Sequence, residues 1–172
     1  MLKCNHSWGG HVCDRQARGI VAYVCRHDEG RPRIRVEISC TTFLAYHFHH
    51  GGIAVLTAYG MDTSDRDIVK AKLLRERSIF LEAVAAVLPK GDQHAAMQEE
   101  ATLAYDRLVA DFDKWVIEFR NGSFLGDSEA DHGCALEEAQ RFGSMEEADA
   151  FMRQHPWTYH NGGMAIPVVR QV

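Results

Sequence analysis

The sequence predicts an α+β fold: an N-terminal antiparallel β meander, a central helical hairpin, and a C-terminal β-hairpin followed by a helix and an edge strand. Three observations favour this order. Residues 18–26 are rich in Ile, Val and Tyr and residues 33–39 alternate charged and apolar side chains. Residues 64–112 repeat apolar side chains at helical spacing, and residues 115–124 alternate again around an Asn-Gly turn. With 172 residues, 46% of them hydrophobic and 25% charged, the chain has a globular composition and can bury a core without disulfides.

Net charge and the content of Cys and His differ along the chain. We expect three segments: residues 1–60, 61–113 and 114–172. The net charge of −5 is unevenly distributed, because the first segment carries +3 and each of the others carries −4. Four of the five cysteines and six of the ten histidines also lie in the first segment. The prediction is a Cys/His-rich β segment, a helical hairpin packed on it, and a ββαβ-like C-terminal module.

Two pairs of strands are predicted in the first segment. Residues 18–26 are rich in Ile, Val and Tyr. In residues 33–39, Ile and Val alternate with charged residues, so we expect one face in the core and the charged face in water. Residues 43–48 and 53–59 flank a His-His-Gly-Gly run, whose glycines can take the positive φ of a tight hairpin. Three or four antiparallel strands follow from this pattern.

Two helices are predicted in the second segment. Ser64 offers an N-cap with an acid three residues later, Pro89 stops the first helix, and Asp92 can cap the second. The apolar residues at helical spacing are Val69, Leu73, Phe80, Val84 and Val87 with Leu74, Leu81 and Leu88 in the first helix, and Met97, Ala101, Ala104, Leu108 and Phe112 in the second. We expect these helices to form an antiparallel hairpin over the sheet.

The third segment begins with a predicted β-hairpin. Large apolar residues alternate through 115–119, and Asn121-Gly122 is the strongest two-residue hairpin turn, so Phe124 begins the return strand. Further on, Ser144 and Glu147 form a capping box for a helix that ends near residue 155, before a proline. Residues 164–169 then predict a last strand, which a proline places at the edge of the sheet.

Part of this third segment resembles a known module. The residues that carry the resemblance are Trp-Val-Ile-Glu-Phe at 115–119, the Asn-Gly turn, Ala-Gln-Arg-Phe at 139–142, Ser-Met-Glu-Glu-Ala at 144–148 and Gly-Met-Ala-Ile-Pro-Val at 163–168. They are similar to a small module of uncharacterised phage and mobile-element proteins. Many small phage proteins bind and block a host complex, anti-CRISPR inhibitors among them. The resemblance therefore implies a non-enzymatic accessory protein that inhibits a host protein complex.

We expect no catalytic residues, because the chain has no Walker A loop and no GxGxxG, HExxH, GxSxG or CxxC motif. The alternative is a metal-dependent hydrolase or nuclease. In that interpretation His47 and His49 share one strand face and act as acid and base, or as metal ligands. Catalysis also needs a carboxylate or nucleophile to orient them, which the spacing does not identify.

We also expect no bound metal, with Cys4, Cys13, Cys25 and Cys40 as small buried apolar residues. The alternative is a zinc site made of Cys4, His6, His11 and Cys13, four donors that lie within ten residues. Their spacing differs from that of common zinc modules, where cysteines lie two to four residues apart. One donor pair would have to curl back on the other to close a tetrahedron.

Two charged surfaces are candidates for partner binding. The first is an acidic surface that mimics nucleic-acid phosphates and binds a host protein or a protein–nucleic acid complex. Its predicted residues are Glu99, Glu100, Asp106, Asp111, Asp127, Glu129 and Asp131. The alternative is a basic stripe for a small nucleic-acid-binding module, made of Arg31, Arg33 and Arg35 on the exposed face of the first sheet.

The sequence predicts no membrane association. The longest apolar run, residues 83–88, is far shorter than the roughly 20 residues of a membrane-spanning helix. The first residues lack the apolar stretch of a secretory signal. We therefore expect a cytoplasmic protein whose cysteines are not paired in disulfides.

Overall fold

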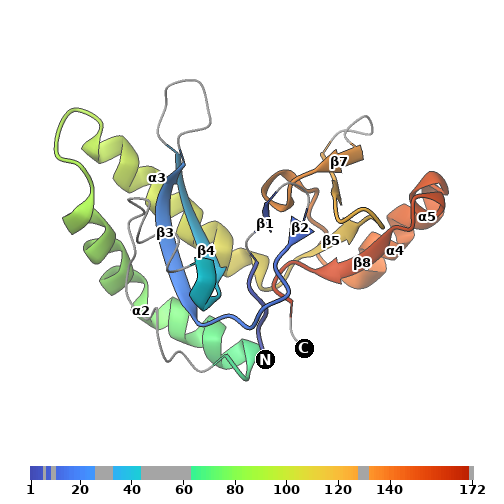
Figure 1. Cartoon of the computed structure of the whole chain (residues 1–172), viewed down its shortest axis with the longest axis horizontal. Helices are drawn as coiled ribbons and strands as arrows, with labels where there is room; N and C mark the ends of the chain where they lie inside the picture. The colour runs from blue at the N-terminus through green and yellow to red at the C-terminus, as the bar shows by residue number, and fades with distance from the viewer. Residues whose placement is uncertain (6, 9–10, 26–32, 44–62, 128–131, 171–172) are drawn as a thin grey trace. The chain divides into compact units, whose positions relative to one another are not determined.

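The structure is a computed structural model that describes residues 1–5, 7–8, 11–25, 33–43, 63–127 and 132–170. The chain divides into two compact units, one built from residues 1–4 and 15–109 and the other from residues 5–14 and 110–170. Both units combine helices with antiparallel strands, which confirms the α+β fold (Figure 1). None of the described helices is long and apolar enough to cross a membrane.

The first unit contains the predicted strand pair. Strand β3 (Gly19–Cys25) runs antiparallel to β4 (Arg33–Ser39), in a register that joins Gly19 to Ser39 and Cys25 to Arg33. The Ile- and Val-rich run and the alternation in residues 33–39 therefore located the two strands correctly. Residues 41–43 are helical, so the predicted strand at 43–48 does not begin there. The rest of that strand and the strand at 53–59 lie outside the described residues.

The second face of this strand pair is not in water, and that prediction was wrong. Glu37 is only 6% exposed and Tyr23, on the same face, is 9% exposed. The Tyr23 hydroxyl donates a hydrogen bond of 2.7 Å to a carboxylate oxygen of Glu37. Burial, together with the neighbouring Glu37 charge, raises the pKa of the Tyr23 hydroxyl. Alternation in a strand shows which side chains share a face, but not whether that face is covered.

Helix α2 (Arg66–Val87) forms as predicted but starts from a different cap. The carboxylate of Asp65, not Ser64, accepts hydrogen bonds from the Asp67 and Ile68 amides at 2.8 and 3.2 Å. Asp and Ser have similar preferences for the N-cap position, so the sequence alone did not show which of these two adjacent residues caps the helix. The helix ends before Pro89, and its buried side chains are Val69, Leu73, Phe80 and Val84.

Helix α3 (His94–Asp111) packs against α2 and completes the predicted helical hairpin. It begins two residues after Asp92, the predicted cap. Tyr105 is 1% exposed, and its hydroxyl donates a hydrogen bond of 2.8 Å to the Leu73 carbonyl oxygen of α2. Its ring lies 4.7 Å from that of Phe80. Burial raises the pKa of Tyr105 to about 12. This tyrosine joins the two helices, and it was missing from the predicted apolar face.

The second unit is built on a four-stranded antiparallel sheet in the order β7-β6-β5-β8. Its strands are β5 (Trp115–Glu118), β6 (Phe124–Leu125), β7 (His132–Cys134) and β8 (Met164–Pro167). Strand β8 lies at the edge and pairs Pro167 with Trp115, as predicted from that proline. Two short strands, β1 (Ser7–Trp8) and β2 (His11–Val12), pair separately.

The β5–β6 turn lies at Asn121-Gly122 as predicted, but it is one residue longer. The Gly122 amide donates to the Phe119 carbonyl oxygen at 2.9 Å, and the Phe119 amide donates to the Ser123 carbonyl oxygen at 2.8 Å. Gly122 has a φ of 81° and follows the tight turn as a bulge residue. The Asn-Gly signal therefore located the turn without fixing its type.

Helix α4 (Met145–Gln154) covers one face of this sheet and keeps most of its predicted cap. The Ser144 hydroxyl accepts from the Glu147 amide at 3.1 Å, but the Glu147 carboxylate accepts from the Gly143 amide at 2.6 Å and not from that of Ser144. A short helix α5 (Trp157–His160) and a 3₁₀ turn η1 (Leu136–Glu138) were not predicted. The two core clusters are Ile117, Phe119, Leu125, Phe142, Ala148 and Met152, and Val116, Phe124, Leu136, Ala139 and Val168.

Candidate metal centre

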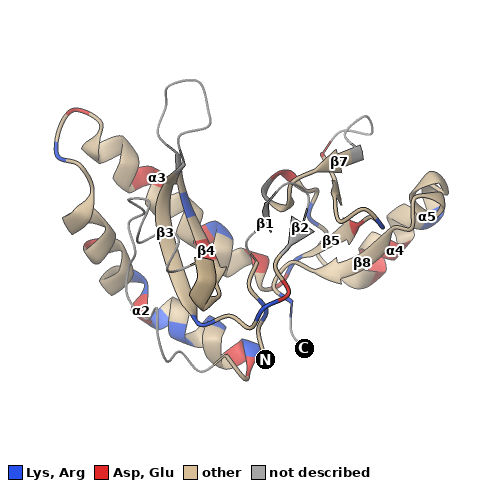
Figure 2. Cartoon of the chain, in the orientation of Figure 1, with Lys and Arg blue, Asp and Glu red and all other residues tan. Residues whose placement is uncertain are grey.

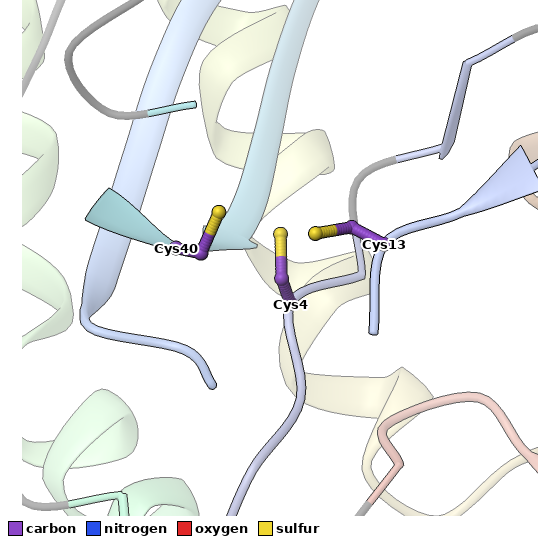
Figure 3. A group of neighbouring side chains, drawn as sticks. All are labelled: Cys4, Cys13 and Cys40. Carbon is purple, nitrogen blue, oxygen red and sulfur yellow. The ribbon is translucent and has the colours of Figure 1, made fainter. Parts of the chain in front are cut away.

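Two cysteines near the N-terminus and a third from the end of β4 lie close together (Figure 3). The sulfur atoms of Cys4, Cys13 and Cys40 all lie within 4.8 Å of one another. Cys4 belongs to the N-terminal segment, Cys13 follows β2, and Cys40 follows β4. None of these three residues forms a disulfide. Among the residues that the structure describes, this is the group of His, Cys, Asp and Glu side chains close enough to hold one metal ion.

Backbone pairing positions Cys4. Its amide donates a hydrogen bond of 2.8 Å to the Arg15 carbonyl oxygen, and the preceding residue, Lys3, forms an antiparallel bridge with Gln16. The Ala17 amide closes the same short ladder by donating to the Leu2 carbonyl oxygen at 2.9 Å. The N-terminal segment is therefore held against residues 15–17, and Cys13 precedes this stretch by only two residues.

The end of β4 is tied to the same stretch, which explains the position of Cys40. The Arg18 amide donates to the Ser39 carbonyl oxygen at 2.8 Å, one residue before Cys40. The Arg15 guanidinium donates to the Thr42 hydroxyl, two residues after it. These bonds hold the backbone on both sides of Cys40 next to residues 15–18. The convergence of the sulfurs thus follows from main-chain pairing.

Arg170 holds the backbone at Cys13. Its guanidinium donates to the Cys13 carbonyl oxygen at 3.4 Å and lies 3.7 Å from a carboxylate oxygen of Asp14. The Arg170 side chain is 17% exposed, whereas that of Asp14 is 79% exposed. The backbone at Cys13 and the carboxylate of Asp14 are therefore both contacted by Arg170.

Burial makes this group unlike a set of surface thiols. Cys4 is 0% exposed and Cys40 is 2% exposed, whereas Cys13 is partly exposed. The residues next to two of them carry buried oxygens, Asn5 Oδ1 and Ser39 Oγ, that have no hydrogen-bond partner in the described part of the chain. Such orphaned oxygens often mark a bound water or ion. Two of the three cysteines are therefore buried, and each is next in sequence to a residue with a buried, unsatisfied oxygen.

The sulfur positions fit a zinc ion. Zinc binds thiolate sulfur at about 2.3 Å in a tetrahedron, which separates two bound sulfurs by about 3.8 Å. The sulfurs here lie within 4.8 Å of one another, so shifts of about 1 Å or less bring all three to bonding distance. Side-chain rotation can supply shifts of that size. A fourth donor from the protein or from water completes the tetrahedron.

The structure describes the side chains of two of the four residues in the alternative zinc site, Cys4 and Cys13. The structure brings Cys4 and Cys13 together as the alternative prediction required, but it adds Cys40 from a distant strand end. His6 lies outside the described residues, and the side chain of His11 in β2 does as well. Cys40 was missed because no spacing rule connects it to the N-terminus. The pairing of residues 2–4 with residues 15–17, to which the end of β4 is also bonded, is the feature that would have connected Cys40 with Cys4.

Not all residues of the predicted acidic surface are exposed. Figure 2 shows where Asp and Glu occur along the chain. Asp111 is 6% exposed and binds Arg141 through two hydrogen bonds of 2.6 and 3.0 Å, so its assignment to that surface was wrong. Asp106 forms two hydrogen bonds of 2.7 Å with Arg77, which hold the pKa of its carboxyl below the ordinary value. Glu100 accepts from the Ile34 amide at 3.0 Å.

The remaining predicted residues divide into exposed ones and ones outside the described part of the chain. Glu99 and Asp127 are exposed, as an acidic surface requires. Glu129, Asp131, Arg31 and the catalytic alternatives His47 and His49 lie outside the described residues, as does the side chain of Arg33. Arg35 is partly exposed, but it shares its strand face with buried Tyr23 and Glu37. The basic stripe on a solvent-exposed face is therefore not supported at this position.

Comparisons with known proteins do not extend this description. No family model, curated protein or solved structure matches the chain. The function proposed below therefore depends on the arrangement of this chain's own residues.

Proposed function

We propose that the protein is a zinc-binding protein in which Cys4, Cys13 and Cys40 supply three thiolate ligands to one ion. The observation that carries this proposal is the convergence of the three sulfur atoms within 4.8 Å, from three separate segments. Thiolate is a preferred zinc ligand, and zinc is commonly held by several cysteines together.

The ion has a structural role in this proposal. Zinc sites with three or four thiolates are of the structural kind, whereas catalytic zinc is held mostly by His and carboxylate ligands. Two of the three cysteines are almost fully buried, which favours a closed site. The ion links the N-terminal segment, the residue after β2 and the end of β4, so its binding free energy adds to the free energy of unfolding.

Cobalt substitution tests this proposal. Co²⁺ in place of zinc is expected to give intense visible d–d bands, because tetrahedral cobalt absorbs far more strongly than octahedral cobalt. The sulfur-to-cobalt charge-transfer band is expected to match three thiolates and to be lost in Cys40→Ser, which keeps only two of the ligands. The control is Cys134→Ser, whose thiol donates instead to the Phe124 carbonyl oxygen at 3.3 Å. Weak octahedral bands, or equal loss in both variants, would contradict the proposal.

We propose, as a second candidate function, that the second unit binds a basic host protein or protein–nucleic acid complex and inhibits it without catalysis. Its charge favours this partner, since residues 5–14 and 110–170 contain twelve Asp or Glu and five Lys or Arg. An excess of one sign speeds the encounter with a partner of the other sign. The resemblance to phage modules supports an inhibitor of a host defence complex, of the anti-CRISPR kind.

Salt dependence and charge reversal test this second function. Binding of a purified nucleic-acid-binding defence complex is expected to weaken about tenfold or more between low salt and about 0.5 M NaCl, because screening removes the attraction. Asp127→Lys is expected to weaken binding at low salt, whereas Arg153→Glu, also at an exposed position, is expected to strengthen it. Affinity that neither salt nor these reversals change would rule out an electrostatic partner site.

A further inference from the structure

The three cysteines differ in their access to solvent. Cys4 and Cys40 are buried, whereas Cys13 is partly exposed. A small oxidant that diffuses from solvent therefore reaches the sulfur of Cys13 first. Oxidation of a cysteine has lasting structural consequences only where a second sulfur stands close enough to react with the product. Here two such sulfurs lie within 4.8 Å.

Cys4 is the better placed of the two neighbours to react with Cys13. Only residues 5–12 separate them, and the Lys3–Gln16 bridge already closes this loop from outside. Figure 3 shows the Cys13 side chain directed toward the sulfur of Cys4. A disulfide of about 2.0 Å between them requires the sulfurs to approach but adds no new loop to the fold. Cys40, by contrast, follows a strand that is paired along its whole length.

We propose that Cys13 is a peroxide-sensitive thiol and that Cys4 converts its oxidised form into a Cys4–Cys13 disulfide. The disulfide itself needs only the two sulfurs. Its consequence, release of the ion, rests on the proposed zinc site, because two sulfurs in a disulfide no longer serve as thiolate ligands. The chain then loses two of its three sulfur ligands in a single reversible step.

Hydrogen peroxide is the oxidant that the formation of the Cys4–Cys13 disulfide requires. The Cys13 thiolate attacks one peroxide oxygen, so an S–O bond forms, the O–O bond breaks and hydroxide leaves. The Cys4 thiolate then attacks the Cys13 sulfur, so the S–S bond forms, the S–O bond breaks and a second hydroxide leaves. The two thiol protons convert both hydroxides into water. Two thiols and one peroxide thus give one disulfide and two waters.

Peptide mass spectrometry of the full chain tests the proposal directly. Trypsin cleaves after Lys3 and Arg15, so one peptide, residues 4–15, contains both cysteines. After treatment of zinc-free protein with one equivalent of peroxide and alkylation, this peptide is expected to lack both alkyl groups and to have lost two hydrogens. A link from this peptide to residues 36–66, which contain Cys40, would overturn the proposed pairing, and so would full alkylation of Cys4 and Cys13.

Variants locate the attacked sulfur. In Cys4→Ser the sulfenic acid on Cys13 has lost its proposed partner, so dimedone is expected to label Cys13 several-fold more than in the wild type. In Cys13→Ser the labelling of residues 4–15 is expected to disappear. Cys134→Ser is the matched control and is expected to form the disulfide as the wild type does. Dimedone adducts on Cys4 or Cys40 ahead of Cys13 would overturn the order of reaction.

The zinc-loaded protein separates this inference from the proposed function. Peroxide is expected to release one zinc per disulfide to a chromogenic chelator, and a reductant followed by zinc is expected to reverse the change. If the chain takes up no zinc but forms the Cys4–Cys13 disulfide, the zinc site fails and the thiol chemistry stands. If zinc binds and peroxide forms no disulfide in the zinc-free chain, the zinc site stands and the proposed thiol chemistry fails.

Discussion

Cys4→Ser is expected to abolish stoichiometric zinc binding and to remove the stabilisation that zinc gives to the chain. Serine is nearly isosteric with cysteine, but its hydroxyl is not a zinc ligand of this kind. Zinc at a hundred times its dissociation constant stabilises the folded chain by about 2.7 kcal/mol, which corresponds to a rise of about 5–10 °C in Tm for a protein of this size. Thermal unfolding of wild type and variant, each with and without zinc, measures that rise.

The Tm of each variant is compared with and without zinc, so that the effect of zinc is separated from the effect of the substitution. Cys4 is fully buried, so serine also destabilises the zinc-free chain by placing a hydroxyl in a dry site. The zinc-dependent increase in Tm removes this contribution, because it compares the same variant with itself. Cys134→Ser is expected to keep the full increase. A Cys4→Ser chain with an unchanged zinc-dependent increase would show that zinc acts elsewhere.

Asp111→Ala is expected to destabilise the second unit by about 3 kcal/mol, the lower end for a broken buried ion pair, because Arg141 keeps some exposure. The side chains of Asp111 and Arg141 are 9% and 16% exposed, and two hydrogen bonds join them. Removal of the carboxylate takes away the acceptor of both hydrogen bonds and the negative charge beside a mostly buried guanidinium. The Arg141 guanidinium also donates a hydrogen bond to the Ala139 carbonyl oxygen at 2.8 Å.

Asp127→Ala is the control for this experiment, since Asp127 belongs to the same unit and is exposed. It is expected to change the free energy of unfolding by less than about 0.5 kcal/mol. Urea unfolding followed by tryptophan fluorescence reports on the correct unit, because Trp115 and Trp157 pack against its core cluster. Equal midpoints for the two variants would mean that the Asp111–Arg141 pair adds nothing to stability.

The elements that the sequence predicted well are those with a strong local signal. The alternation in β3 and β4, the apolar spacing of α2, and the proline at the edge strand each depend on the residues of one segment. Caps and turns were correct in kind but shifted by a residue, at Asp65 and at Gly122. Neighbouring residues there have similar preferences, and tertiary contacts decide between them.

The parts that the sequence did not predict depend on contacts between distant segments. The burial of Glu37 requires knowledge of what covers the strand face, and the pairing of Asp111 with Arg141 joins residues 30 positions apart. The metal centre shows the same limit. Cys4 and Cys13 are near in sequence and were recognised together, whereas Cys40 reaches them only because Ser39 and Thr42 are bonded to residues 15–18.

The zinc content of untagged protein is the measurement that tests the central claim most directly. Native mass spectrometry of the chain, supplied with zinc and then dialysed, is expected to show one zinc ion per chain, and none in the triple variant Cys4→Ser, Cys13→Ser, Cys40→Ser. An untagged chain is necessary because a polyhistidine tag binds zinc itself. A wild-type chain that retains no zinc, or a triple variant that retains as much as the wild type, would contradict the account.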